Sequence, residues 1–174
     1  MIMTAPATAP RCAWAAQDPL LRDYHDTEWG VMPPTDNAAF ELLTLEVFQA
    51  GLAWRTVLAK RPAFRRAFAD FAIPLFGASD ASAVARLLND PNIIRNRRKI
   101  EATIANARAV LAIIDEVGTF RDWLSGLPGD ADAAYSVMHQ RLTGCGPIVC
   151  RSYLEAIGII PPPHEPGCWK EPGR

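Results

Sequence analysis

The sequence predicts an all-α protein built as a compact helical bundle. Apolar residues recur every three or four positions along most of the chain, which is the period of an amphipathic helix, and alternating strands are hard to find. Capping residues and glycine or proline stops bracket several of these segments. Hydrophobic residues make up 49% of the 174 residues and charged residues 21%, as is usual for globular proteins.

Two helices are expected in the first half of the chain. Asp36 can cap a helix that runs through AAFELLTLEVFQAG and ends near Gly51. Pro62 can begin a short helix that carries Phe64 and Phe68, because a proline in the first helical turn loses no hydrogen bond.

The middle of the chain predicts two more helices. An amphipathic segment begins at Ser79 or Asp80 and stops before Pro91. The clearest helix follows at about Asn96–Val117, where isoleucine, leucine and alanine form one continuous apolar face. Gly118 is expected to end it.

Two further helices are expected to flank a short turn near the C-terminal end. Residues 127–130 form a loop with proline and glycine, and Asp132 can then cap AAYSVMHQRL. A second helix is expected over Pro147–Ile157. The element at about 132–157 resembles the helix-hairpin-helix of DNA repair enzymes.

The turn of this element, LTGCGP at residues 142–147, is a candidate phosphate site. Gly144 and Gly146 permit a tight turn whose backbone N–H groups point outward at the start of the next helix, where an anion can bind. The same pattern occurs in glycine-rich helix connections without a ligand, so both interpretations stay open.

The chain shows no internal repeat and no linker, which predicts one domain at residues 11–174 after a disordered tail at residues 1–10. The first ten residues lack the features of a signal peptide, and no segment approaches the ~20 apolar residues of a membrane span. We therefore expect a cytoplasmic protein without membrane contact. The formal net charge of −1 excludes a global positive field.

Four residues near the two ends of the chain form a possible metal-ligand set, namely Cys12, His25, His164 and Cys168. Two cysteines and two histidines are the set that a structural tetrahedral zinc ion requires. A zinc ion there would clamp the N-terminal segment to the C-terminal segment. Chance spacing and plain burial of these residues remain the alternative.

An acidic residue in an apolar helix is a second candidate functional group. Glu46 has leucines one helical turn before it and an alanine one turn after it, and a carboxylate is costly to bury without a partner. It therefore either binds a specific ligand or pairs with the backbone or an arginine. Four rings nearby in the sequence can either sandwich a flat base or pack in the core: Trp14, Tyr24, Trp29 and Trp54.

Three segments together resemble the bacterial 3-methyladenine DNA glycosylase I family, in the same order and at similar spacing. They are RCAWAAQDPLLRDYHDTEWG, LTLEVFQAGLAW and IIRNRRKIEATIANARAVL. The resemblance extends from about Arg11 to Leu111 and returns at His164 to Cys168.

The resemblance implies a role for each candidate residue. The zinc ligands of the family fall on Cys12, His25, His164 and Cys168. Its base-pocket residues fall on Glu46 and Tyr24 as the catalytic pair and on Trp14, Trp29 and Trp54. Gly51 and Leu52 fall where the family presses a small wedge into the DNA, and the backbone contacts are expected at Gly144, Gly146, Arg97, Arg98 and Lys99.

The implied activity is hydrolysis of the bond between deoxyribose and N3-methyladenine in alkylated double-stranded DNA. The damaged base would be flipped into the aromatic pocket, where Glu46 opposes its positive charge. The pocket motifs contain no lysine for a Schiff base, so base removal without strand cleavage is expected, by a monomer. The alternatives are a zinc-stabilised damage-sensing or DNA-binding module without catalysis and a structural interaction domain.

Overall fold

The computed structural model describes residues 9–171, and within this range it is entirely helical, with no strand. The prediction of an all-α bundle is confirmed; residues 1–8 of the expected tail lie outside the described range. The helices are α1 (Ala13–Ala16), α2 (Pro19–Thr27), α3 (Asp36–Gln49), α4 (Trp54–Ala67), a 3-10 turn (Ala69–Phe71), α5 (Ile73–Gly77), α6 (Ala81–Asn89), α7 (Arg97–Val117), α8 (Phe120–Ser125), α9 (Ala131–Arg141) and α10 (Pro147–Ala156).

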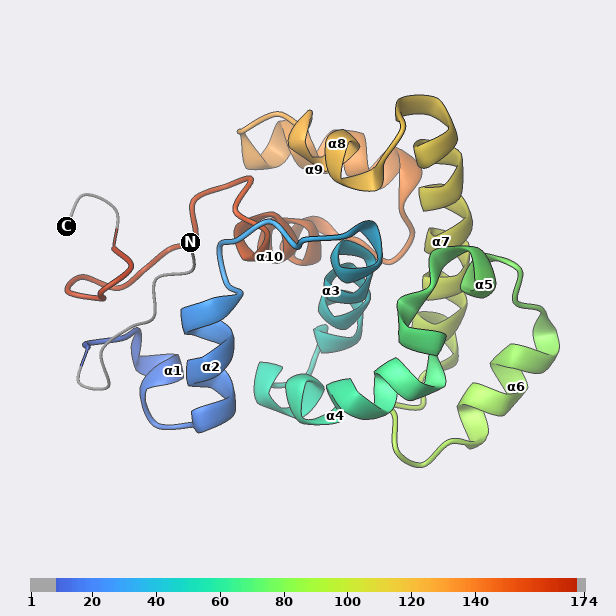
Figure 1. The fold of residues 1–174 in the computed structure, drawn as a ribbon, viewed down its shortest axis with the longest axis horizontal. Coiled ribbons are helices and arrows are strands. Elements are labelled where there is room, and N and C mark those ends of the chain that lie inside the picture. Colours follow the sequence, from blue (N-terminus) through green and yellow to red (C-terminus); the bar gives the residue numbers. More distant parts are fainter. Residues whose placement is uncertain (1–8, 172–174) are drawn as a thin grey trace.

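Helix α3 lies at the centre of the molecule, with α4, α7, α8 and α10 packed around it (Figure 1). Every residue from Ala39 to Phe48 is buried, because neighbours cover the helix on all sides. This helix carries both buried glutamates of the described chain, Glu41 and Glu46. The core helix therefore brings two carboxylates into an apolar interior.

The cap of α3 differs from the prediction. Thr35, and not Asp36, is the N-cap, and its hydroxyl accepts a hydrogen bond from the Ala38 amide at 3.2 Å. The Asp36 carboxylate instead accepts hydrogen bonds from the amides of Phe120 and Arg121 at 3.1 and 3.0 Å. Asp36 therefore caps α8, a helix that the sequence did not predict.

Removing this long-range cap is expected to destabilise the protein. Asp36→Ala leaves two partly buried amides at the start of α8 without an acceptor, and the expected loss is about 1 to 2 kcal/mol. Urea unfolding would measure it. Asp132→Ala, which removes an exposed carboxylate from the first turn of α9, serves as the matched control. Equal losses in both variants would contradict the capping role.

Pro62 does not begin a helix, contrary to the prediction, but lies inside α4. The helix starts at Trp54 and continues through the proline, which has no amide to bond the carbonyl four residues earlier. Packing of Val57, Leu58 and Phe64 into the core stabilises the helix on both sides of that gap. The sequence analysis placed the start of this helix too late because it treated the proline as a first-turn residue, whereas core packing outweighs the one missing hydrogen bond.

The start expected at Ser79 or Asp80 and the end expected at Gly118 are confirmed, and the helix expected from about Asn96 has that residue as its N-cap. Asp80 accepts hydrogen bonds from the first amides of α6, Asn96 caps α7, and Gly118 ends α7 with φ at +98°. Helix α9 begins earlier than expected, since Asp130 and not Asp132 is its N-cap. The short helices α1, α2 and α5 were not predicted, because one or two turns carry too little periodicity to be recognised.

The chain segments near the two ends lie side by side, to the left in Figure 1. The Trp169 amide donates to the carbonyl of Pro10 at 2.9 Å, and the Ala13 amide donates to the Glu165 carboxylate at 2.8 Å. This pairing brings distant cysteines and histidines together. No helix in the described part of the chain is long and apolar enough to cross a membrane.

Candidate active site and metal centre

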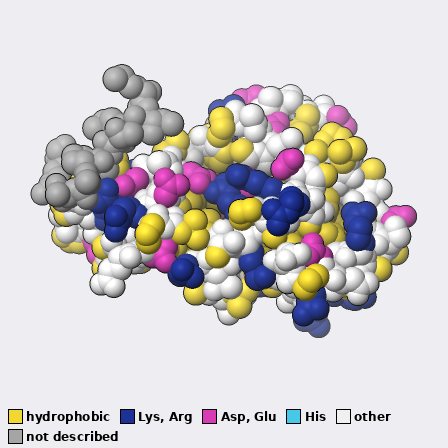
Figure 2. All heavy atoms as spheres, turned by 60° about the horizontal axis from the view of Figure 1, so that its bottom comes forward, with side chains coloured by type: hydrophobic (Ala, Val, Ile, Leu, Met, Phe, Trp, Pro, Cys, Tyr) yellow, Lys and Arg dark blue, Asp and Glu magenta, His cyan; other side chains and the backbone are white. Residues whose placement is uncertain are grey.

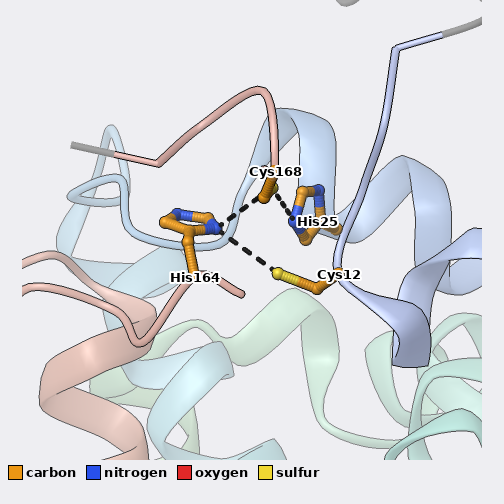
Figure 3. Close-up of side chains that lie close together, drawn as sticks. All are labelled: Cys12, His25, His164 and Cys168. Atoms are coloured by element: carbon orange, nitrogen blue, oxygen red, sulfur yellow. Dashed lines mark hydrogen bonds between the residues drawn. The ribbon is translucent and has the colours of Figure 1, made fainter. Parts of the chain in front are cut away.

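Cys12, His25, His164 and Cys168 converge at the junction of the two terminal segments (Figure 3). Their ligand atoms all lie within 4.8 Å of one another. The Cys168 sulfur is 3.4 Å from His25 Nε2 and 3.6 Å from His164 Nδ1, and the Cys12 sulfur is 3.7 Å from the same His164 atom. The sequence prediction that these four residues form one group is confirmed.

The spacing of this cluster fits a tetrahedral metal ion. Zinc–sulfur bonds of about 2.3 Å and zinc–nitrogen bonds of about 2.0 Å at tetrahedral angles separate the two ligand atoms by about 3.5 Å. The three measured sulfur–nitrogen distances of 3.4 to 3.7 Å surround that value. The donor set and these three distances therefore fit a tetrahedral metal ion such as zinc.

A hydrogen-bonded carboxylate orients one of the ligands. His25 Nδ1 lies 2.9 Å from Asp26 Oδ1, which leaves Nε2 facing Cys168. Burial opposes ionisation of Asp26, but hydrogen bonds from Arg11, His25 and Trp169 outweigh it and hold its pKa at about 2. An ionised carboxylate only accepts, so Nδ1 donates. This carboxylate–histidine arrangement is typical of metal sites.

The second histidine is also ready to bind a cation. Burial, followed by the nearby His25 and Lys170, lowers the pKa of His164 to about 4. Its imidazole is therefore neutral at pH 7, with a lone pair available to a metal ion. Burial raises the pKa of the Cys12 thiol to about 11, and the hydrogen bond that the Glu165 amide donates to its sulfur at 3.3 Å opposes this shift.

Beside the metal cluster is a cavity of about 350 Å³ between α1, α2, α3, α4 and α10. All five residues assigned to the base pocket from the sequence line it: Trp14, Tyr24, Trp29, Glu46 and Trp54. The rings of Trp14 and Trp29 meet edge to face at 5.2 Å, and those of Tyr24 and Trp54 at 5.1 Å. The rings thus leave a space between them and do not fill it.

Glu46 is the distinctive group of this cavity. Its side chain is 3% exposed, and among the described residues no group hydrogen-bonds to Oε2. Burial raises its pKa to about 7, with a smaller contribution from the negative charge of Glu155, while the Ser152 hydroxyl lowers it. A buried carboxylate oxygen without a partner is costly, and a site of this kind is a candidate for binding a ligand.

The second buried glutamate on α3, Glu41, is paired with arginines, as buried carboxylates usually are. Glu41 accepts hydrogen bonds from Arg61 and Arg65 at 2.6 to 3.3 Å. Burial raises its pKa, but these bonds outweigh burial and bring the pKa below the usual value. The alternative that a buried glutamate pairs with arginine thus holds for Glu41 and fails for Glu46, for which no such ion pair is found in the described chain.

Two further groups complete the polar edge of the cavity. The indole Nε1 of Trp54 is buried, and no described residue accepts its hydrogen bond. Burial, together with the charge of Glu46, raises the pKa of Tyr24 well above its usual value, so its hydroxyl stays protonated. Beside the aromatic rings, Glu46 therefore offers an acceptor, and Trp54 and Tyr24 offer donors.

The sequence analysis missed several residues that line the cavity. They are Leu21, Gln49, Ala53, Arg55, Ser152 and Glu155. Gln49 follows Glu46 by three positions on α3, a spacing that places both on one helix face. Nothing comparable in the sequence linked Ser152 and Glu155 to the pocket, because α10 joins it only through tertiary packing.

The hairpin and the α3–α4 turn lie beside the cavity. A second hollow of about 460 Å³ is lined by residues 49–52 and 146–149, so Gln49 borders both spaces. Gly144 has φ at +77°, and an added Cβ would approach Ala102 and Val47 to 3.3 and 3.4 Å. Asn106, missed by the sequence analysis, fixes the hairpin by bonding both polar backbone groups of Thr143.

The three basic residues assigned to DNA contact lie at the start of α7. Arg98 is exposed, and Arg97 lies 3.4 Å from Glu101. Lys99 is half-buried, and its ammonium group donates to the carbonyls of Phe48 and Ala50. Lysine and arginine side chains also gather on the face turned forward in Figure 2, although the net charge is −1.

The comparisons with known proteins agree with this geometry. The family model described as methyladenine glycosylase matches residues 14–141. DNA-3-methyladenine glycosylase 1 of Escherichia coli is 37% identical over 94% of this chain and 98% of its own. A crystal structure of a 3-methyladenine DNA glycosylase I superposes with a TM-score of 0.84 at 36% identity, covering 94% of this chain and all of that one.

A further solved structure carries a ligand. It is a tyrosine-to-phenylalanine variant of a 3-methyladenine DNA glycosylase I in complex with 3-methyladenine. It matches with a TM-score of 0.83 at 31% identity over 93% of this chain and 97% of that one. On the strength of the family match, the near full-length identity and the shared fold, this chain belongs to the methyladenine glycosylase family.

Proposed function

We propose that the protein is a monofunctional DNA glycosylase of base excision repair that removes N3-methyladenine from alkylated DNA. The observation that carries this conclusion is the buried carboxylate of Glu46, whose Oε2 has no hydrogen-bond partner among the described residues, inside a cavity walled by aromatic rings. Relatives of the same family and fold are named for this activity. The cavity volume of about 350 Å³ lies in the range of small-molecule sites.

The charge of the damaged base explains how the pocket selects it. Methylation at N3 gives the adenine of a nucleotide a positive charge, which Glu46 is placed to oppose. Stacking on Trp54 and Trp14 contributes roughly 1 to 3 kcal/mol, with an added cation–π attraction. Neutral adenine gains neither charge-dependent interaction. The pocket therefore does not offset the free energy of unstacking and unpairing that base, which stays in the duplex.

The positive charge also activates the leaving group. When the bond between deoxyribose C1′ and the base breaks, the bonding electrons move to the base and neutralise it. Water adds to C1′ and releases a proton to solvent. Glu46 and Tyr24 hold and orient the base, and none of the described residues that line the cavity is a lysine able to attack C1′.

The DNA duplex is proposed to lie across the mouth of this pocket. The N–H groups at Gly144 and Gly146 face a phosphate, the turn at Gly51 and Leu52 enters the base stack, and Arg97 and Arg98 contact the backbone. Leu52 is 39% exposed and lines the hollow beside the hairpin, which suits insertion. One copy of the chain supplies all of these elements, so we propose a monomer acting on double-stranded DNA.

One structural zinc ion on the cluster of Cys12, His25, His164 and Cys168 is proposed to hold the two terminal segments together. Residues 11–174 then form one glycosylase domain. Its DNA substrate makes the cytoplasm the proposed location. The metal lies outside the cavity and takes no part in base release; its ligands support the pocket through the rings of Trp14 and Trp29.

Release of methylated bases from duplex DNA tests the proposal. With methylated DNA, we expect free 3-methyladenine as the main product, intact strands, and a kcat/KM that falls about tenfold per pH unit below pH 7, because protonation of Glu46 removes its charge. Glu155→Gln removes a neighbouring negative charge and should lower the pKa of Glu46, so the fall in kcat/KM should begin at a lower pH. Tight binding without base release would favour the damage-sensing alternative.

A further inference from the structure

The turn that follows α3 is exposed and has little support of its own. Helix α3 ends at Gln49, Gly51 has φ at +81°, and the Leu52 amide closes the turn by donating to the Gln49 carbonyl at 2.7 Å. An added Cβ on Gly51 would meet nothing within 4 Å. This turn, residues 50–52, therefore projects from the surface and needs an anchor to hold one position.

Lys99 supplies such an anchor from a distant part of the chain. Its ammonium group donates to the carbonyls of Phe48 at 2.8 Å and Ala50 at 2.6 Å. The last carbonyls of a helix have no partner within the helix and carry partial negative charge, so a cation there is stabilising. The two hydrogen bonds tie the end of α3 and the base of the turn to α7.

Helix α7 is a rigid support for this contact. Ile100, the next residue along the chain, is fully buried, and the Lys99 amide donates to the capping side chain of Asn96 at 3.2 Å. Burial lowers the pKa of Lys99, which shows that its ammonium group is partly withdrawn from solvent. The side chain thus faces the end of α3, whereas its neighbour Arg98 is exposed.

We propose that Lys99 is a positioning residue for DNA, holding the turn at residues 50–52 so that Leu52 enters the base stack without first being ordered. The inference rests on the proposed glycosylase function and assigns Lys99 to the turn in place of a phosphate. Because the turn is already held in the position it takes on DNA, less free energy is spent on ordering it when the protein binds. Displacement of a group that positions a substrate costs up to about 100-fold in rate.

The test compares Lys99→Met with Arg98→Met, its exposed neighbour on the same helix turn. On methylated duplex DNA, Lys99→Met should lose about 10- to 100-fold in kcat/KM. Single-stranded methylated DNA, which needs no wedge, should show a much smaller loss, and affinity for free 3-methyladenine, followed by tryptophan fluorescence, should not change. Lys99→Arg, which keeps the donors and the charge, should restore part of the duplex activity.

Salt dependence separates the two roles of a basic residue. Arg98→Met should reduce the slope of log affinity against log salt by about 1, as loss of a phosphate contact does, whereas Lys99→Met should leave it unchanged. A reduced slope for Lys99→Met, or equal losses on both substrates, would overturn the proposal. Thermal unfolding shows whether each variant is folded. If Lys99→Met does not fold, Lys99→Gln takes its place in the same assays.

The wild-type protein distinguishes failure of this inference from failure of the proposed function. If the wild type releases no 3-methyladenine from either substrate, the glycosylase assignment is wrong. If the wild type is active and Lys99→Met matches it on duplex DNA, only the role of Lys99 is wrong.

Discussion

Glu46→Gln is expected to slow the release of 3-methyladenine strongly and, at the same time, to make the free protein more stable. Glutamine keeps the shape of the side chain but cannot oppose the positive charge of the base. Removing one such electrostatic partner costs about 100- to 1,000-fold in rate. The released base, quantified by chromatography, measures this loss.

The gain in stability follows from the pKa of Glu46, which is about 7 in the folded protein against an ordinary value of 4.5. Between these values the folded state holds more protons than the unfolded chain, so stability falls as the pH rises towards 7. Since each pKa unit corresponds to about 1.4 kcal/mol, Glu46→Gln should gain about 3 kcal/mol of unfolding free energy at pH 8 and almost nothing at pH 4. Urea unfolding at both pH values measures the difference.

Glu41→Gln is the matched control on the same helix. Its carboxylate accepts hydrogen bonds from two arginines, and the variant leaves Arg61 with Glu28 as its one remaining ion-pair partner among the described residues and takes the carboxylate from the half-exposed Arg65. Glu41→Gln should therefore lower the free energy of unfolding by about 2 kcal/mol, the opposite sign to Glu46→Gln. Two variants that destabilise the protein equally, or a Glu46→Gln protein that still releases base at the wild-type rate, would show that Glu46 is an ordinary structural residue.

Loss of the metal cluster is expected to give the second large effect. Cys168→Ala, or a strong chelator, should remove one bound zinc ion and release the C-terminal segment from α1 and α2. We expect the free energy of unfolding to fall by about 3 kcal/mol, which corresponds to a fall of about 6 to 12 °C in Tm for a chain of this size. Metal content by mass spectrometry and calorimetry measure both changes.

The same change should reach the base pocket. The His164 ring lies 4.6 Å from Trp29 and the His25 ring 5.4 Å from Trp14, so the cluster supports two walls of the cavity. We expect KM for methylated DNA to rise more than kcat falls. Cys145→Ala, at a buried cysteine outside the cluster, should keep the metal. A purified protein without metal whose Tm does not respond to chelator would refute the zinc assignment.

Interactions between residues close together in the sequence determined most of the helices and made the candidate site residues recognisable. The helical period, the cap at Asp80 and the glycine at position 118 specify helices through contacts within a few residues, and the structure confirms them. The two cysteines and two histidines were recognisable by type, and the tryptophans and Glu46 by their segments. The roles of the pocket residues in base release stay predictions.

Only the tertiary structure decided which partner each polar group has. Glu41 and Glu46 look alike in the sequence, yet one faces the arginines of α4 and the other faces a cavity. Asp36 caps a helix 84 residues further along the chain, and Lys99 bonds carbonyls 49 and 51 residues before it. Hydrogen bonds and ion pairs act over a few ångströms, so pairings between distant residues exist only once packing has placed the helices.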